Sequence, residues 1–547
     1  MTSATELIRS LLDKEQARIL SSWRVHDNRL ALLQICRATD SLLFGALTDT
    51  EAFEFAREGA SKAVSLFVDR SCDNQRIPLF PSEHETFQWA HSVLQHCGRL
   101  AVCEKFLEYE KAGLGMFREC GRDLEFEITP RYAGIEAMEE QENQWLESSI
   151  RNRQEPFQEL RSSLRPKINA QMQDLVYVWH EHYIGYQANP RIDAYFDHEG
   201  VMAAQEMTGH DVFADDSLFG GLPFGFFRST VWTLVGWALK HVSFALLLHE
   251  KHPDLRLENL LTVTADVDVL VSEIAASLQV TTRDARQALD LLELNLPNKN
   301  RLCINGHAPP PLIRAASEQY LKPVAGFLVE PFQFMLRNLR EQYLPDWDRA
   351  VNERERLFRT ELLDLFPQPF LRKFPRGLRL TRRGNTLTDI DTILIDEKNG
   401  FVGLFQLKWQ DPFGHSMRER AARMKNFQRE ASSWIDAVSE YLEHSAEEEK
   451  KRLFGFSKSS PAPGYCLFVV GRYFAQFSGN QMPDDRAAWA VWPQLMRLAE
   501  KHRGSHNPLL HLHNAVKADS PFKREVAFSL PDLELDGRTI KVKQSQS

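Results

Sequence analysis

Three polar side chains interrupt two apolar runs near residue 400 in a pattern that suits hydrolytic chemistry. Asp391 lies in the run 388–395, and Gln406 and Lys408 lie in the run 401–409. Carboxylate and amide oxygens are the ligands that a hard divalent cation prefers, and a neighbouring ammonium can position water and offset developing negative charge. These residue types predict metal-assisted hydrolysis of an anionic substrate, with Mg²⁺ or Mn²⁺ as the cofactor.

The two runs must be neighbouring strands if these side chains are to meet. Residues 396–400 (DEKNG) stand between them, and such acidic, Asn and Gly residues are typical of a hairpin turn. Successive side chains on a strand point to opposite faces, so Asp391 is expected on one face with Ile393 and Ile395. Gln406 and Lys408 share a face of the second strand. Most positions on both faces are apolar, which predicts a sheet covered on both sides.

This arrangement resembles the core of the PD-(D/E)XK superfamily, the restriction-endonuclease-like nucleases. Their motif is an Asp, a hairpin, and then an acid or Gln, any residue and Lys; here the halves are TDID at 388–391 and QLK at 406–408. The Q-x-K form is similar to the Mrr-type branch. The resemblance covers residues 352 to about 502. It implies an α/β restriction-endonuclease-like domain that cleaves DNA with a bound metal ion, and a role in defence against foreign DNA.

The helix expected over residues 352–366 carries the candidate for a third metal-holding side chain. Its apolar stripe includes Phe358 and Leu365, and Glu361 borders that stripe. Related nucleases often place a Glu on this helix, so the resemblance implies this role for Glu361, with Glu355 as second choice. The alternative is an exposed acid in a charged helix.

A basic segment over residues 371–383 lies directly before the hairpin. It holds six Lys and Arg residues and no acid. Beside a phosphodiester site, it would supply sequence-independent phosphate contacts; the alternative is a strand edge protected by charge. A helix expected over 418–441 adds basic residues near its start. The predicted nucleic-acid contacts are Arg376, Arg379, Arg382, Arg383, Arg420 and Arg423.

Two other functions remain open from the sequence. Asp391 and Lys408 could form a salt bridge inside an inert nuclease fold, which would make the protein a nucleic-acid-binding or scaffolding component. Gln in place of Glu lowers the negative charge of the site and favours this alternative. RNA is a further possible substrate, and a protein partner or a second copy of the chain is a possible partner besides DNA.

Composition points to a cytoplasmic protein with no membrane segment. The net charge is −9, so any nucleic-acid contact must come from a local basic face. The seven cysteines include no CxxC pair, as expected for thiols in a reducing compartment. The first residues carry acids, unlike a secretory or transit signal. The apolar stretch 221–248 contains Arg228, Lys240 and His241, which favours a buried helix over a membrane span.

The chain is long enough for several domains, with a mostly α N-terminal part that includes a winged-helix-like module and precedes the α/β domain. The final residues 541–547 are expected to lack order, and 487–502 are expected to form a helix. The predicted divisions are a helical domain 1–120, a mixed and mostly helical region 121–257, a winged-helix module 258–306, a helical connector 307–350, a nuclease-like domain 351–505 and a C-terminal extension 506–547.

The winged-helix prediction rests on two short helices, expected over 267–278 and 283–292, with a turn between them and a possible wing at 301–305. Thr282 is the expected N-cap of the second helix, and Gln279 stands where such turns commonly carry Gly. The second helix offers Arg283, Arg286 and Gln287 to a groove. The alternative is a module for packing or dimerisation.

Overall fold

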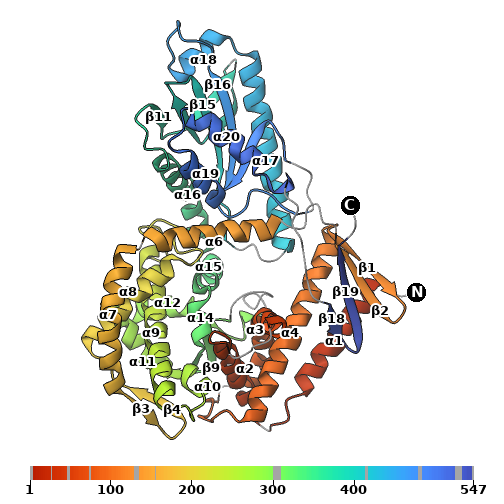
Figure 1. Cartoon of the computed structure of the whole chain (residues 1–547), viewed down its shortest axis with the longest axis vertical. Helices are drawn as coiled ribbons and strands as arrows, with labels where there is room; N and C mark the ends of the chain where they lie inside the picture. Colours follow the sequence, from red (N-terminus) through yellow and green to blue (C-terminus); the bar gives the residue numbers. More distant parts are fainter. Residues whose placement is uncertain are drawn as a thin grey trace.

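The computed structural model combines many helices with several small sheets. It describes residues 4–25, 27–45, 50–72, 75–128, 135–153, 155–299, 309–382, 384–412, 417–478, 483–523 and 532–544. Figure 1 shows a C-terminal unit (α16 to α20) standing above a broad helical part, with helix α6 (Ile135–Arg153) lying across the junction. The mixed, multi-part layout agrees with the predicted fold class at this coarse level.

The N-terminal helices pack so closely that two glycines are required. A Cβ on Gly59 of one helix would lie 2.0 Å from the carbonyl oxygen of Leu94, and a Cβ on Gly98 would lie 1.8 Å from that of Phe55. Helical spacing of apolar residues builds this region as predicted. The helices are α1 (Ala4–Ser21), α2 (Arg29–Leu42), α3 (Thr50–Ser71) and α4 (His84–Lys111).

A four-stranded sheet joins residues 115–128 to the C-terminal residues 533–544. β2 (Asp123–Ile128), where a short strand was predicted, pairs with β1 (Gly115–Cys120) and also, in parallel, with β19 (Arg538–Gln544). β18 (Leu533–Leu535) completes it. The prediction that 541–547 lack order is therefore wrong for 541–544, because Ile540 and Val542 alternate with lysines and bring their apolar side to the sheet.

The middle region is built around one long apolar helix, α9 (Phe224–Lys251). It is long and apolar enough to cross a membrane, but 67% of its most apolar window is buried by the rest of the protein. This agrees with the predicted core helix. Its neighbours are α7 (Glu155–Leu175), β3 (Val176–Trp179), β4 (Tyr183–Tyr186), α8 (Pro190–Gln205), β5 (Leu218–Phe219), β6 (Leu222–Pro223) and α10 (Glu258–Leu261).

The predicted helix–turn–helix is present. Gln279 ends the first helix in the left-handed conformation (φ +55°), which explains why Gly is common at this position. The N-cap of the second helix is Thr281 rather than Thr282, since its hydroxyl accepts the N–H of Asp284 at 3.2 Å. The suggested wing at 301–305 lies outside the described residues. The elements are β7 (Val263–Asp266), α11 (Val267–Leu278), α12 (Thr282–Asp290) and β8 (Glu293–Leu294).

The predicted helical connector over 307–350 is wrong in its first part. Residues there form β9 (Leu312–Ala316) and β10 (Gln319–Lys322), which join β7 and β8 in a sheet of order β7-β10-β9-β8. The helix–turn–helix unit thus extends to Lys322. Helices α14 (Val324–Leu328) and α15 (Pro331–Gln342) follow.

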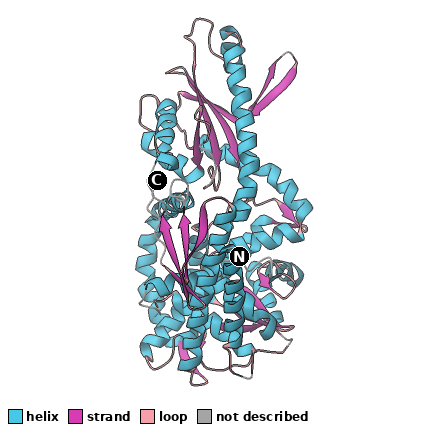
Figure 2. Cartoon of the chain, turned by 90° about the vertical axis from the view of Figure 1, so that its right-hand side faces the viewer, coloured by secondary structure: helices cyan, strands magenta, loops and turns pink. Residues whose placement is uncertain are grey.

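The C-terminal unit holds a mixed five-stranded sheet of order β11-β14-β15-β16-β17. Its first three strands are antiparallel neighbours, and its last three run parallel. Figure 2 shows the sheet beside a long helix, with a two-stranded hairpin projecting next to that helix. In chain order the elements are α16 (Leu344–Asp364), β11 (Leu371–Phe374), the hairpin β12 (Leu378–Arg382) and β13 (Asn385–Ile390), β14 (Thr392–Asp396), β15 (Phe401–Lys408), α17 (Met417–His444), α18 (Glu447–Phe454), β16 (Gly464–Gly471), β17 (Ala487–Val491), α19 (Trp492–His502) and α20 (Pro508–Ala518).

Two predicted boundaries in this unit need correction. Residues 487–491 form strand β17 instead of the start of a helix, because they pair in parallel with β16. The proposed domain end at 505 is too early, since α20 contributes Leu509, Leu512 and Val516 to the apolar core on one face of the sheet.

Buried and half-buried ion pairs attach the C-terminal unit to the helical part. Arg472, at the end of β16, is buried and pairs with both Asp211 and Glu361. Arg497 of α19 donates to Glu142 of α6 at 2.8 Å. Removing one partner of a buried pair leaves the other charge uncompensated, so these contacts strongly favour one arrangement of the two parts.

Candidate active site

The predicted hairpin is present, and its register brings Asp391 beside Gln406. β14 and β15 pair antiparallel with Thr392 opposite Phe405. Asp391 directly precedes β14, and its N–H donates to the carbonyl oxygen of Phe405 at 3.1 Å. One step along this ladder places the side chain of Gln406 next to that of Asp391.

Asp396 closes the turn of the hairpin from a fully buried position. Its carboxylate accepts the N–H of Asn399 at 3.0 Å, and its carbonyl oxygen accepts the N–H of Gly400 at 2.8 Å. Gly400 has φ +73°, a conformation that favours glycine. The acidic, Asn and Gly residues that predicted the turn are thus the ones that form it.

The two faces of the hairpin enter separate apolar cores, as predicted. Ile393, Ile395 and Leu404 pack in one core with residues of α17. Phe405 and Leu407 pack in another core with residues of α16, α19 and α20. Because side chains alternate along each strand, the polar groups of Asp391, Gln406 and Lys408 belong to the α17 face.

The Asp391 carboxylate is held by two donors from the neighbouring strand. Its Oδ2 accepts Nε2 of Gln406 at 2.7 Å and the N–H of Leu407 at 2.6 Å. Only 6% of Asp391 and 7% of Gln406 is exposed. Asp391 Oδ1 and Gln406 Oε1 accept no hydrogen bond from any residue that the structure describes. Two oxygens on adjacent strands therefore remain available to a ligand.

The surroundings of Asp391 disfavour its negative charge. Burial raises the pKa of Asp391 to about 7, while the Leu407 N–H acts in the opposite direction. Smaller contributions to this pKa come from the charge of Glu355, which raises it, and from that of Lys408, which lowers it. A cation placed beside Asp391 would therefore stabilise the carboxylate.

Lys408 forms an ion pair that was not predicted from the sequence. Its Nζ lies 3.0 Å from Oε2 of Glu430, a half-exposed residue of α17. Lys408 itself keeps 26% of its side chain exposed. The alternative of a direct Asp391–Lys408 salt bridge is not what the structure forms, although Lys408 is near enough to influence the charge of Asp391.

The structure places the two candidate acids of α16 differently. Glu355 is exposed and acts electrostatically on Asp391. Glu361, the first choice from the sequence, instead forms an ion pair with Arg472 at the contact with Asp211. Glu355 is therefore the better-placed third acid, and Glu361 belongs to the attachment of the C-terminal unit.

Gly377, in the basic segment, packs against the backbone of the site. It has φ +63°, and a Cβ there would lie 2.4 Å from the carbonyl oxygen of Ile390 and 2.9 Å from that of Asp391. Only glycine fits this position, so the turn between β11 and β12 fixes the backbone that carries Asp391. A glycine next to basic residues was the only signal of this role in the sequence.

Two predicted nucleic-acid contacts remain open to solvent. Arg376 and Arg379 are exposed next to the site, on the turn before β12 and on β12 itself. Arg382 pairs with Glu440 of α17 at 2.8 Å and is half-buried. Arg383 lies outside the described residues. The basic segment therefore offers Arg376 and Arg379 most directly to an anion.

The two predicted contacts on α17 point into the protein. Arg420 is buried and pairs with Glu139 of α6, so its assignment to nucleic acid is wrong. Arg423 is half-buried and donates to the carbonyl oxygen of Asp411 at 2.9 Å. Their charges serve packing, because α17 begins at the junction with the helical part.

The arrangement can accept a hard divalent cation with few protein ligands. Asp391 and Gln406 present open oxygens side by side, and no described residue places a compensating charge at contact distance from the desolvated carboxylate. Among the described residues, no group of three or more His, Cys, Asp or Glu side chains is gathered as in a tight metal centre. Mg²⁺ commonly keeps several waters and uses one or two carboxylates, so this donor set fits it.

The helix–turn–helix unit uses much of its second helix for internal contacts. Arg286 pairs with Asp268 at 2.8 Å, and Gln287 donates to the carbonyl oxygen of Gly220 at 3.2 Å. Arg283 is exposed. Two of the three groove candidates are thus engaged within the chain, which favours the packing interpretation of this unit.

Comparison with known proteins gives no relative: no protein-family model, no curated protein and no solved structure matches this chain.

Proposed function

We propose that this protein is a metal-dependent endonuclease of the PD-(D/E)XK type that hydrolyses DNA phosphodiester bonds at Asp391, Gln406 and Lys408. The observation that carries the proposal is the hydrogen bond between Asp391 and Gln406 on the α17 face of one hairpin, with Lys408 on the same face of the second strand. The order helix α16, antiparallel strands β11, β14 and β15, helix α17 and parallel strand β16 supports the same family.

Each side chain has a role that its position supports. Asp391 would supply an anionic oxygen and Gln406 an amide oxygen to hold Mg²⁺ or Mn²⁺, and Glu355 adds negative charge from α16. When bound, the cation would stabilise the charge of the scissile phosphate and activate water. The Lys408 ammonium, steadied by Glu430, orients that water and offsets the charge that develops in the transition state.

The polyanionic substrate is supported by the basic residues beside the site. Arg376 and Arg379 are exposed, and such side chains supply the phosphate contacts that dominate nucleic-acid affinity. DNA is proposed over RNA on the strength of the family resemblance, which also suggests a role in defence against foreign DNA. Most of the described cysteines are buried thiols, in accord with a cytoplasmic location.

A second candidate function is an inert nuclease fold that binds nucleic acid without cleaving it. The observation that favours it is the internal pairing of the site, since Gln406 donates to Asp391 and Lys408 pairs with Glu430. This alternative gives DNA binding that depends on Arg376 and Arg379 but needs no metal ion.

Cleavage of plasmid DNA by the full chain tests the proposal. Nicking that needs Mg²⁺ or Mn²⁺ and disappears in Asp391→Ala would support it. Metal-independent binding without nicking would support the inert alternative, and cleavage of RNA alone would keep the site but change the substrate. Cleavage that persists in both Asp391→Ala and Lys408→Ala would contradict the assignment of the site.

A further inference from the structure

A second chemically distinctive region lies in the helical part, away from the hairpin. It is a cavity of about 540 Å³ between α8, α9 and the helix–turn–helix unit. The floor includes the buried residues Leu234, Ala238 and Phe327, and Trp237 lines a wall. A cavity of this size with a mostly apolar floor and a few polar groups is typical of a small-molecule site.

Lys322 brings an uncompensated charge to this cavity. It ends strand β10 and is half-buried, and its ammonium makes no hydrogen bond or ion pair with any residue that the structure describes. Desolvation lowers the pKa of Lys322, with Glu273 opposing that change and Lys240 adding to it. A buried ammonium without a partner is costly, so an anion at this position would be stabilised.

The other charged groups around Lys322 do not supply that anion. Lys240 already pairs with Asp193 at 2.6 Å. Glu273 and Asp197 are exposed at the rim. Of the two neighbouring ammonium groups, Lys240 therefore has a carboxylate at contact distance, whereas Lys322 has none among the described residues.

His241 and Tyr186 are hydrogen-bonded to each other beside Lys322 and add no charge to the cavity. The His241 ring lies 3.0 Å from the carbonyl oxygen of Leu261 through Nε2 and 3.2 Å from the Tyr186 hydroxyl through Nδ1. Burial, with a smaller contribution from the charge of Lys322, lowers the pKa of His241 to about 4. His241 is therefore neutral near pH 7, and the positive charge at this end comes from Lys322 and Lys240.

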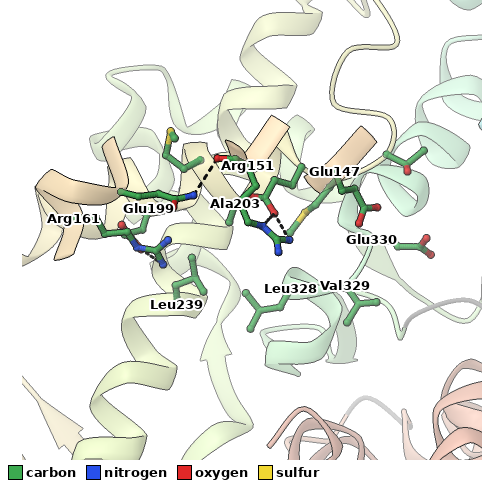
Figure 3. A pocket seen from close by; sticks show the side chains of 14 residues that line it. Glu147, Arg151, Arg161, Glu199, Ala203, Leu239, Leu328, Val329 and Glu330 are labelled. Atoms are coloured by element: carbon green, nitrogen blue, oxygen red, sulfur yellow. Dashed lines mark hydrogen bonds and ion pairs between the residues drawn. The ribbon is translucent and has the colours of Figure 1, made fainter. Parts of the chain in front are cut away.

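A neighbouring hollow differs from this cavity in the pairing of its cations. It has a volume of about 520 Å³ and is lined by residues of α6, α7 and α8 (Figure 3). Its two arginines are already paired, Arg151 with Glu206 at 2.9 Å and Arg161 with Glu199 at 2.7 Å. In that hollow both arginines pair with carboxylates of the same chain, whereas Lys322 has no such partner among the described residues.

We propose that the cavity around Lys322 binds a small organic anion: its anionic head lies between Lys322 and Lys240, and its flat apolar body packs against Trp237 and Phe327. The walls come from α8 and α9 on one side and from β7, α11 and β10 on the other. A bound anion would thus join the helix–turn–helix unit to the long helix α9. This site is independent of the nuclease assignment.

A matched pair of fluorescent probes tests the proposal on the full chain. 1-Anilinonaphthalene-8-sulfonate carries an anionic head, and N-phenyl-1-naphthylamine has the same body without it. We expect Lys322→Met to weaken binding of the sulfonate at least about tenfold, as for loss of a charged hydrogen bond, while the neutral probe changes less than about twofold. Trp237→Ala should weaken the binding of both probes.

Two further variants control for folding and for surface charge. Lys322→Arg keeps a cation and should retain the preference for the sulfonate. Lys167→Met removes an exposed lysine of α7 and should leave the binding of both probes unchanged. The proposal is overturned if the wild type shows no saturable sulfonate binding, if Lys322→Met leaves it unchanged, or if Lys322→Met weakens both probes equally.

Discussion

Gln406 donates its side-chain amide to Asp391 across two neighbouring strands, with Nε2 2.7 Å from Oδ2. Both residues are buried, so this bond fixes the carboxylate in a single orientation. The same bond turns the amide nitrogen towards Asp391, which leaves the amide oxygen for another partner. Gln in this position therefore both positions the carboxylate and offers an oxygen of its own.

The raised pKa of Asp391 predicts an unusual pH dependence of stability. The pKa of Asp391 is about 7 in the folded chain, against an ordinary value of 3.8. A folded state that holds the proton more tightly is stabilised at low pH, and this contribution is lost as the pH rises from 3.8 to about 7. Urea unfolding in EDTA should show this loss of stability with rising pH, and Asp391→Asn should remove this pH dependence.

Added Mg²⁺ should change that pH dependence in a defined direction. The cation binds the ionised carboxylate, so it should stabilise the protein more at about pH 8 than at about pH 5. A stabilisation by Mg²⁺ that is equal at both values, or that survives in Asp391→Asn, would show that the cation binds elsewhere.

Gly377→Ala should disturb the site through the backbone. A Cβ there meets the carbonyl oxygens of Ile390 and Asp391, whereas a Cβ on Gly384, at φ +82°, meets nothing within 4 Å. Gly384→Ala should lower the free energy of unfolding by about 1–2 kcal/mol because of its backbone conformation alone. Gly377→Ala should lower it clearly more. Urea unfolding of both variants measures the difference; equal losses would show that the close contact has no effect.

The hairpin could be predicted because its information is local. The sequence 396–400 forms its own turn, and the alternation of apolar residues sets the faces of β14 and β15. The strands at 312–322 were missed because they are short apolar runs that do not differ from helix segments by periodicity. At 487–491, the Ala residues favour a helix locally, and parallel pairing with β16 overrides that preference.

The supporting contacts of the site could not be predicted because they join distant parts of the chain. In the sequence, Arg420 does not differ from the other basic residues of α17. Its pairing with Glu139 is seen only in the fold. Likewise, Glu361 lies on the expected helix, but Arg472 and Asp211 determine its role. Spacing within α16 cannot distinguish Glu355 from Glu361, since both lie on the same charged helix.

Glu355 and Glu361 should therefore respond differently to substitution. Glu355→Gln removes a charge that acts on Asp391, so the Mg²⁺ concentration for half-maximal cleavage should rise about tenfold. Glu361→Gln should leave that concentration unchanged and lower stability by about 1–3 kcal/mol, because buried Arg472 loses a partner. The opposite pattern would restore Glu361 as the metal-holding residue.

Arg376 and Arg379 should contribute phosphate contacts without sequence preference. The double substitution to Gln should weaken binding to all DNA sequences alike and reduce the slope of log affinity against log salt by about 2. Arg9→Gln with Arg122→Gln, two exposed arginines of the N-terminal part, is the matched control and should leave the slope unchanged. An unchanged slope in the Arg376 and Arg379 variant would remove the basic segment from the interface.

Metal-dependent cleavage of plasmid DNA tests the central claim most directly. The account predicts nicking by the wild type with Mg²⁺ or Mn²⁺, none with EDTA, and loss of at least about a hundredfold in rate for both Asp391→Asn and Lys408→Met. Asp364→Asn, an exposed acid of α16, should remain fully active. Undiminished cleavage by Asp391→Asn and Lys408→Met would contradict the account.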